Sequence, residues 1–242
     1  MIALGNVYAD GYRLAPHRHR RGQLLCGISG VLTVTTFQGS WIMPPHRGVW
    51  VPGGIEHEVR MQGIVTTHSL YLEDARGLMP ENCQVLAISP LLQALMAEAV
   101  DLEVDYELGS RADALMQLIR HELPLLPTLP LSLPFPVNAR LLRLCRRFLR
   151  SPGIHATIDD WSKQLDMSRR AFTRFFRQET GVSLAMWCRQ ACLVSAMPRL
   201  VAGEAITQVA LDLGYENPAA FTTMFKRAFG ASPRAYLKLE ER

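Results

Sequence analysis

The side chains with the most specific chemical potential lie in a short basic stretch between residues 168 and 181. Four polar residues recur there at the spacing of one helix face: Arg170, Thr173, Arg174 and Arg177. Arginine can donate two hydrogen bonds to a guanine in the major groove, and threonine can contact a thymine methyl group or a base edge. Arg177, farther along, is better suited to a phosphate. The face predicts direct readout of DNA, and the competing interpretation is an arginine-rich face that only contacts water.

A second stripe on the same stretch indicates how this helix is held. Phe172, Phe175 and Phe176 fall on a different face, which suits packing against a core. The apolar frame occurs twice along the chain, at an offset of 48 residues that becomes 49 after the turn. The paired positions are Ser162 with Ala210, Leu165 with Leu213, Phe172 with Phe221, Phe176 with Phe225, and Gly181 with Gly230. Two helix-turn-helix units are therefore predicted, which argues against a merely solvated arginine face.

Capping residues mark where the helices of the repeat begin. Thr157 and Asp160 have the spacing of a capping box, and Ser168 precedes the arginine-rich helix. Asn217 followed by Pro218 predicts the start of the corresponding helix in the second unit. The extra residue of the second unit falls in its turn, where a loop can absorb it.

Two segments of this region resemble the AraC family of bacterial transcription regulators: TIDDWSKQLDMSRRAFTRFFRQETGVS and ITQVALDLGYENPAAFTTMFKRAFGASPRAY. The resemblance implies that a long helix, here residues 184–197, joins two units whose recognition helices enter successive major grooves roughly 34 Å apart. Pro198 is expected to stop or kink that helix. The base-reading positions that the resemblance implies are Arg170, Thr173 and Arg174 in the first unit, and Ala219, Thr222 and Thr223 in the second.

The second reading face is sparse. Where the family often has arginine, this chain has Thr223. The second unit is therefore expected to contribute mostly backbone contacts, through Lys226 and the helix start at Asn217.

The front of the chain has a different pattern. Between Gly22 and Glu73, short apolar runs alternate with glycine and proline, which predicts the strands of a barrel or sandwich. Helices are predicted from Leu91 to Ala99 and from Ala112 to Leu123, because apolar residues recur there at helical spacing. These helices could cover the barrel or pair two subunits. The prolines between residues 124 and 137 then exclude a helix and predict an extended, semi-rigid tether.

Part of this front region resembles the cupin β-barrels. The residues that carry the first cupin motif are Gly11, His17, His19, Gln23 and Gly30, with Gln23 in the place of a glutamate. PGGIEH, residues 52–57, matches most of the second motif. In metal-binding cupins the corresponding side chains hold one divalent cation. The implied set is His17, His19, Gln23 and His57, four neutral ligands, so metal affinity is expected to be reduced. The alternative is that the histidines form hydrogen bonds within the barrel or line a ligand pocket.

Other side chains bear on such a pocket. Candidates for its wall are Trp41, Trp50, His68 and Tyr71, although aromatic residues at strand spacing more often belong to a core. The neighbouring cations would disfavour a metal ion and attract an anionic ligand. They are Arg18, Arg20 and Arg21.

Charge and cysteine content bound the class of protein. Residues 1–137 carry 9 Lys and Arg against 13 Asp and Glu, a net charge of −4, whereas residues 138–242 carry 17 against 9, a net charge of +8. A basic C-terminal region suits a polyanionic partner. Five cysteines without a Cys-x-x-Cys pair indicate a reducing compartment. No membrane span or signal peptide is apparent, so the expected location is the cytoplasm.

These patterns predict an α+β protein of two domains. A cupin-like sensor barrel is expected over residues 1–88, a helical coupling or dimerisation segment over 89–123, a proline-rich linker over 124–137, and an all-α domain with two helix-turn-helix units over 138–242. The expected partners are a double-stranded DNA operator, a small-molecule effector in the barrel and a second copy in a homodimer. No cofactor is required, although the barrel could hold a divalent metal.

The predicted function is transcription regulation without enzymatic activity. The segments GQLLCGISGVLTV and RGVWVPGGIEHEVRM are similar to the AraC-type group that often regulates adjacent efflux transporters. The alternative is a metal-dependent cupin enzyme with an accessory DNA-binding domain. A third interpretation is an architectural DNA-binding protein without a ligand.

Overall fold

The chain divides into two compact units in a computed structural model that describes residues 1–43, 45–129 and 131–240. The first unit comprises Met1–Thr36 and Trp41–Ser132, and the second comprises Phe37–Ser40 and Leu133–Arg242. The division near residue 132 lies inside the proline-rich segment. Within the described ranges, no helix combines the length and the apolar character needed to cross a bilayer.

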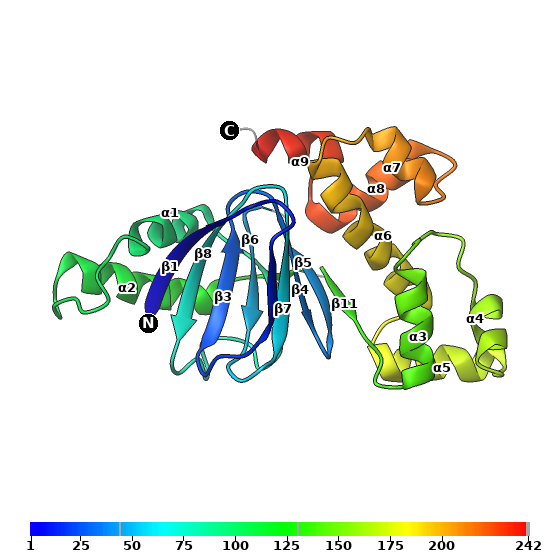
Figure 1. Ribbon diagram of the computed structural model, residues 1–242, viewed down its shortest axis with the longest axis horizontal. Helices are drawn as coiled ribbons and strands as arrows, with labels where there is room; N and C mark the ends of the chain where they lie inside the picture. The colour runs from blue at the N-terminus through cyan, green and yellow to red at the C-terminus, as the bar shows by residue number, and fades with distance from the viewer. Residues whose placement is uncertain (44, 130, 241–242) are drawn as a thin grey trace. The chain divides into compact units, whose positions relative to one another are not determined.

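Two sheets carry the strands of the described residues, and Figure 1 labels most of these strands. One sheet runs β1-β8-β3-β6-β9-β10, and the other runs β11-β5-β4-β7-β2. The strands are β1 Ile2–Tyr8, β2 Arg13–His17, β3 Gly22–Gly27, β4 Val31–Thr36, β5 Gly39–Met43, β6 Arg47–Val51, β7 His57–Gln62, β8 Val65–Leu72, β9 Gln84–Ala87, β10 Thr128–Leu129 and β11 Ser132–Pro134. The runs between Gly22 and Glu73 thus form strands as predicted. The strands β1, β2 and β9 were not predicted.

Register in the first sheet assigns each strand residue to one of two faces. Gln23 pairs with Tyr71, and the neighbouring pair is Leu24 with Leu70. Because successive side chains of a strand point to opposite faces, Gln23 and Tyr71 share one face whereas Leu24 and Leu70 share the other. The second face is apolar and belongs to the core of the unit.

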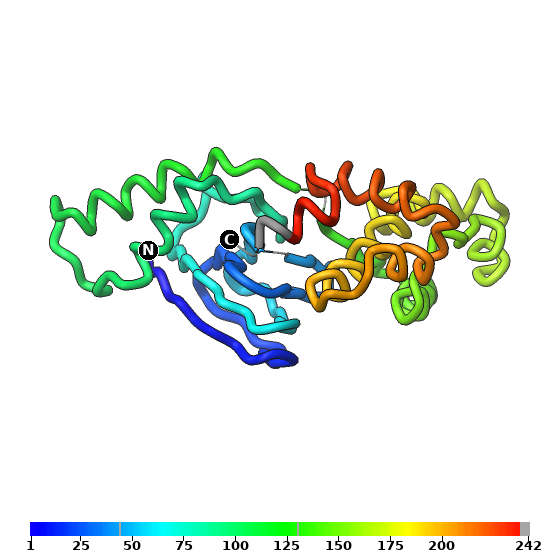
Figure 2. Tube along the Cα trace, turned by 90° about the horizontal axis from the view of Figure 1, so that it is seen from above, coloured from blue at the N-terminus to red at the C-terminus, as the bar shows by residue number. Residues whose placement is uncertain are grey.

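Helices α1 Pro90–Ala99 and α2 Arg111–Glu122 cover this apolar face, as Figure 2 shows in teal and green. The hydroxyl groups of Ser89 and Ser110 cap them, as their positions in the sequence suggested. Leu92 and Ile119 are fully buried in the same core as the sheet residues. These helices therefore cover the sheet within one chain, which was one of the two roles predicted for them.

The described residues of the proline-rich segment 124–137 are mostly extended, but they do not form a free tether. After a short 3-10 helix, Leu123–Leu125, the strand β10 pairs with β9, and β11 lies beside β5 at the edge of the other sheet. Edge strands tolerate proline because its missing N–H need not enter a ladder. Leu131 and Leu133 are buried, and the burial of their apolar side chains stabilises the packing of this segment.

The second unit is helical. Its helices are α3 Ala139–Phe148, α4 Ile158–Gln164, α5 Arg169–Thr180, α6 Leu184–Val201, α7 Ile206–Asp212, α8 Pro218–Phe229 and α9 Pro233–Glu240. An aromatic cluster of Trp161, Phe172, Phe176 and Trp187 fills the core around α4 and α5, and the Trp187 indole donates to the Pro134 carbonyl at 2.8 Å. The expectation was that Pro198 stops or kinks α6; the helix runs three residues past it, so the proline does not stop the helix, and a kink there stays a prediction. The proline lies in the last turn of the helix, where it removes one i→i−4 hydrogen bond.

Candidate DNA-binding face and histidine cluster

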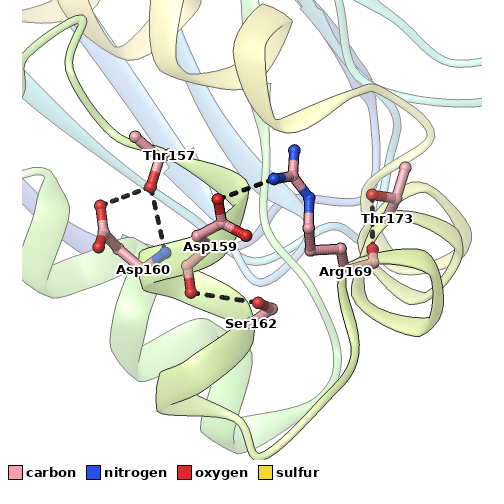
Figure 3. Close-up of polar contacts among 6 residues, drawn as sticks. All are labelled: Thr157, Asp159, Asp160, Ser162, Arg169 and Thr173. Atoms are coloured by element: carbon pink, nitrogen blue, oxygen red, sulfur yellow. Dashed lines mark hydrogen bonds and ion pairs between the residues drawn. The ribbon is translucent and has the colours of Figure 1, made fainter.

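Local hydrogen bonds fix the first helix-turn-helix unit, as Figure 3 shows. The Thr157 hydroxyl accepts from the Asp160 backbone N–H at the start of α4 and donates to the Asp160 carboxylate at 2.5 Å. The Asp159 carboxylate forms an ion pair with Arg169, the first residue of α5, and accepts a hydrogen bond from its guanidinium at 2.8 Å. The two helices are thereby linked at their N-terminal ends, which orients α5 relative to α4.

Helix α5 separates a buried face from an exposed one. Phe172 and Phe176 are essentially inaccessible to solvent, at 0% and 1% exposure. The four residues predicted to contact DNA are all exposed: Arg170, Thr173, Arg174 and Arg177. They border a hollow of about 590 Å³ together with Ile158 and Gln178. The structure thus brings the predicted reading residues together on one accessible face.

The arginines of this face are available for a ligand. Within the described residues, the side chains of Arg170, Arg174 and Arg177 have no ion-pair partner, whereas Arg169 is paired with Asp159. The Thr173 hydroxyl donates to the Arg169 carbonyl at 2.8 Å, so its methyl group and its lone pairs are the parts free for contact. Three cations without internal partners on one exposed helix face are suited to phosphates and to guanine edges.

The second helix-turn-helix unit repeats this arrangement of buried residues, but its exposed face carries fewer cations. Phe221 and Phe225 are fully buried, as their counterparts in α5 are. Ala219, Thr223 and Lys226 are exposed, and Thr222 is partly buried. Asn217 caps α8, because its side-chain oxygen accepts from the Ala219 N–H at 2.8 Å. At the corresponding positions, the exposed face of α8 therefore carries one cation, Lys226, whereas the face of α5 carries three.

The turns of the two units have the same backbone geometry. Asp166 and Gly214 both have positive φ, at 57° and 83°. The next residue in each turn, Met167 or Tyr215, donates its N–H to the residue five positions earlier, Ser162 at 2.9 Å or Ala210 at 3.0 Å. The additional residue of the second unit is therefore Glu216, placed after the shared turn.

In the sheet-rich unit of the chain, three of the predicted histidines lie close together. The potential ligand atoms of His17, His19 and His57 all lie within 4.8 Å of one another. His17 and His57 face each other across β2 and β7, with ring centroids 4.4 Å apart, and His19 follows β2 in the loop. Burial lowers the pKa of His57, and the neighbouring His17 and His19 lower it further, although the hydrogen bond to the Ile55 carbonyl raises it. These effects together favour the neutral form of the His57 ring.

Gln23 joins the cluster from the other sheet. Its amide oxygen lies 3.1 Å from Nε2 of His19. Its amide nitrogen donates to the Ser69 hydroxyl at 3.1 Å and to the Tyr71 hydroxyl at 2.9 Å. Tyr71 thus lies beside the histidine cluster, and burial raises the pKa of its hydroxyl.

Three other predicted wall residues lie elsewhere. Trp50 pairs with Leu24, and His68 pairs with Cys26, so both are on the face of the sheet opposite Gln23. Trp50 is core and donates its indole N–H to the Pro80 carbonyl at 2.7 Å. Trp50 and His68 therefore do not lie with the histidine cluster, and Trp50 instead borders a separate hollow with Arg20 and Glu73. Trp41 is buried in β5, and within the described residues no hydrogen bond or ring contact joins it to the histidine cluster.

A cavity that the sequence did not predict lies beside α2. It has a volume of about 460 Å³ and includes Glu73, Asp74 and Arg120 among its polar lining, with Leu72, Tyr106 and Met116 as apolar lining. Its residues come from segments distant in the sequence, and no local spacing connects them.

Comparisons with known proteins agree with this architecture. Residues 161–239 match a helix-turn-helix domain family. The HTH-type transcriptional regulator NimR of Escherichia coli (strain K12) is 32% identical over 221 residues, which cover 91% of this chain and 81% of that protein. The chain belongs to the AraC family of transcription regulators. As a member of this family, it is a DNA-binding regulator of transcription.

Other similarities are more limited. The transcriptional activator RhaR of Yersinia pseudotuberculosis is 31% identical over 88 residues, 36% of this chain and 30% of that protein. Among solved structures, the AdpA DNA-binding domain in complex with a target DNA is 26% identical over 42% of this chain and 93% of that chain, with a TM-score of 0.40. ToxT from Vibrio cholerae covers 98% of both chains at 11% identity, with a TM-score of 0.41.

Proposed function

We propose that this AraC-family regulator recognises its operator chiefly through α5 and responds to a small molecule bound by the sheet-rich unit. The observation that carries the first part is the exposed face of α5, where Arg170, Arg174 and Arg177 have no internal partner within the described residues. Helix α8 is proposed to add mainly backbone contacts, because its corresponding face holds Ala219, Thr222 and Thr223.

Replacing Arg174 by alanine tests base reading by α5. On a sequence selected by the full chain, Arg174→Ala should weaken binding by about 1–3 kcal/mol and relax the preference at one base pair, because a bidentate contact is lost. Arg177→Ala is the matched control on the same face, and it should weaken binding to all sequences alike. Gel shifts at fixed salt measure both. If Arg174→Ala weakened all sequences uniformly, Arg174 would be a phosphate contact.

The sensing part of the proposal rests on the histidine cluster, because Gln23 and Tyr71, which adjoin it, lie on the face of the sheet opposite the core under α1 and α2. A small molecule that binds the sheet-rich unit differently in two states of α1 and α2 would change operator affinity by linkage. Gel shifts with and without candidate effectors test this. Operator affinity that no effector changes would contradict the sensing role and leave the DNA-binding role standing.

Two related expectations remain proposals. We propose a regulator in the cytoplasm, where its DNA is, and not a metal-dependent enzyme with an accessory DNA-binding domain. NimR, which aligns with this chain over 81% of its own length, is called a transcriptional regulator. A homodimer through α1 and α2 also stays a prediction. Leu91 and Leu118 are 48% and 41% exposed there, and light scattering on the full chain measures the state.

A further inference from the structure

The histidine cluster has hydrogen bonds that prepare each ring for the same task. In each of the three residues, Nδ1 lies against a backbone carbonyl two residues away: Ala15 for His17 at 2.8 Å, Arg21 for His19 at 2.5 Å, and Ile55 for His57 at 2.9 Å. A carbonyl oxygen only accepts, so the proton of each neutral ring is on Nδ1. Nε2 of each ring is then left with a lone pair, and the other nitrogen is fixed by the backbone as it is in metal-binding histidines.

Gln23 and His19 place two acceptors against each other. Because the amide nitrogen of Gln23 donates to Ser69 and Tyr71, its oxygen is the atom turned to Nε2 of His19, at 3.1 Å. Neither atom has a proton to donate when the His19 ring is neutral. In the neutral ring the two lone pairs therefore face each other, and a cation within reach of both would relieve their repulsion.

His57 provides an independent indication. It is only 2% exposed, and its Nε2 is buried without a hydrogen-bond partner. A buried polar atom that lacks a partner costs free energy, and such an atom in a folded protein often marks a missing ligand. The orphaned nitrogen lies in the same cluster as the other two rings, so a single ligand could satisfy all of them.

We propose that His17, His19, His57 and Gln23 bind one divalent transition-metal ion. Three imidazole nitrogens and a neutral amide oxygen suit Zn²⁺ and the other later first-row ions better than Mg²⁺ or Ca²⁺. Ligand atoms about 2.1 Å from one ion are at most about 4.2 Å apart, so the rings, whose ligand atoms lie within 4.8 Å of one another, need to move only slightly inward.

The neutral ligand set determines what the bound ion would attract. No carboxylate among the four offsets the double charge of the ion, and Arg20 and Arg21 share the single carboxylate of Glu73 nearby. The site therefore favours an anionic oxygen donor, such as a carboxylate, at the open coordination position. This part of the inference rests on the proposed sensing role of the unit.

Metal titration of the full chain, first freed of metal with a chelator, tests the proposal. Calorimetry with Zn²⁺ should give one equivalent, and Co²⁺ should give visible absorption bands of a nitrogen-rich site. His17→Ala and His57→Ala should each weaken Zn²⁺ binding by at least about tenfold, because each removes a ligand. His121→Ala, on the exposed surface of α2, is the matched control and should bind as the parent does.

Gln23→Glu separates loss of a ligand from damage to the fold. The added negative charge should tighten Zn²⁺ binding by about tenfold or more, and the hydroxyls of Ser69 and Tyr71 can donate to the new carboxylate. A damaged fold cannot produce a gain. Absence of Zn²⁺ binding, an equal loss in His121→Ala, or weaker binding in Gln23→Glu would overturn the metal site.

Adding acetate to the Co²⁺-loaded chain tests the open position. Acetate should shift the absorption bands, and unchanged bands at saturating acetate would overturn the proposed anion ligand. Gel shifts of the same variants report DNA binding independently, so failure of the metal site and failure of the regulator's DNA-binding role are distinguishable.

Discussion

Thr173 on α5 and Thr223 on α8 show how a side chain's local bonds limit what it can read. Each hydroxyl donates to the carbonyl four residues earlier, at 2.8 Å and 2.9 Å. The donor is therefore occupied, and the methyl group and lone pairs remain for DNA. The arginines carry no such internal bond in the described residues. For this reason Arg170 and Arg174, rather than the threonines, are expected to provide most of the base discrimination.

The five cysteines form a second residue-scale test. All are buried, and burial raises the pKa of the Cys145, Cys188 and Cys192 thiols to about 12. Because only the thiolate reacts and its fraction at pH 8 is about 10⁻⁴ for such a thiol, alkylation of the folded protein should be very slow. Mass spectrometry after iodoacetamide treatment, with and without guanidinium, measures this. Rapid labelling of these three thiols in the folded protein would contradict their burial.

Some residues of the sites could be predicted from the sequence and others could not. The reading face of α5 follows from a helical period within one segment, so spacing alone sufficed. The placement of Trp50 and His68 depends on register between strands that are distant in the sequence. A shift of one residue moves a side chain to the opposite face, and no local pattern fixes that shift.

At the scale of elements, the loop that contains Pro52, Gly53 and Gly54 holds the histidine loop in place. The Gly54 N–H donates to the His19 carbonyl at 2.8 Å. A Cβ added at Gly53 would lie 2.1 Å from the Arg20 carbonyl oxygen, which is backbone and cannot turn aside. The close approach of these two loops is what positions His19 near His57.

Gly53→Ala should therefore be more damaging than Gly54→Ala. A Cβ at Gly54 meets nothing within 4 Å, and its cost is the strain of a φ of +82°, about 1–2 kcal/mol. Gly53→Ala should cost about 3 kcal/mol or more in the free energy of unfolding, at the upper end of the usual cost of overpacking, because the loops must separate. Urea denaturation measures both variants. Equal stability of the two would contradict the packing of these loops.

Helices α6 and α7 are joined by a charge cluster with a defined pH dependence. Arg199 on α6 donates to Glu204 at 2.7 Å and to Asp212 at the end of α7. The hydrogen bond from Arg199 holds the pKa of Asp212 below its usual value. A lowered carboxyl pKa stabilises the fold above the unfolded value of about 3.9, and this stabilisation is lost as the pH falls through the folded pKa.

Asp212→Asn should thus weaken the dependence of stability on pH below about 4. The parent should lose free energy of unfolding on acidification more steeply than the variant. Urea denaturation followed by far-UV circular dichroism, at neutral pH and at a series of acidic values, compares them. An identical slope in both proteins would show that this carboxylate does not couple folding to pH.

The proline-rich segment shows what element prediction could and could not reach. Proline spacing excluded a helix between residues 124 and 137, and the segment is extended apart from the short turn at Leu123–Leu125. That it pairs as β10 and β11 could not be predicted, because the pairing depends on edges offered by β9 and β5. An edge is a property of the assembled sheet and not of the segment that joins it.

At the scale of the whole molecule, charge and structure divide the chain in similar places. Residues 1–137 have a net charge of −4 and residues 138–242 a net charge of +8, and the units meet in the sequence near residue 132. The basic part holds both helix-turn-helix frames. Phosphate attraction alone would give binding that weakens steeply with salt for any DNA. We propose that sequence preference comes mainly from the exposed faces of α5 and α8, which are unequal.

The most direct test of this account is selection of bound duplexes from a random library by the full chain at physiological salt. The account predicts one enriched motif with two parts about 10 base pairs apart, one per helix-turn-helix unit. The part read by α5 should be strongly specified and the part under α8 weakly specified, and Arg174→Ala should remove one preferred base pair from the first part. Enrichment of no motif, with binding that depends only on salt, would contradict it.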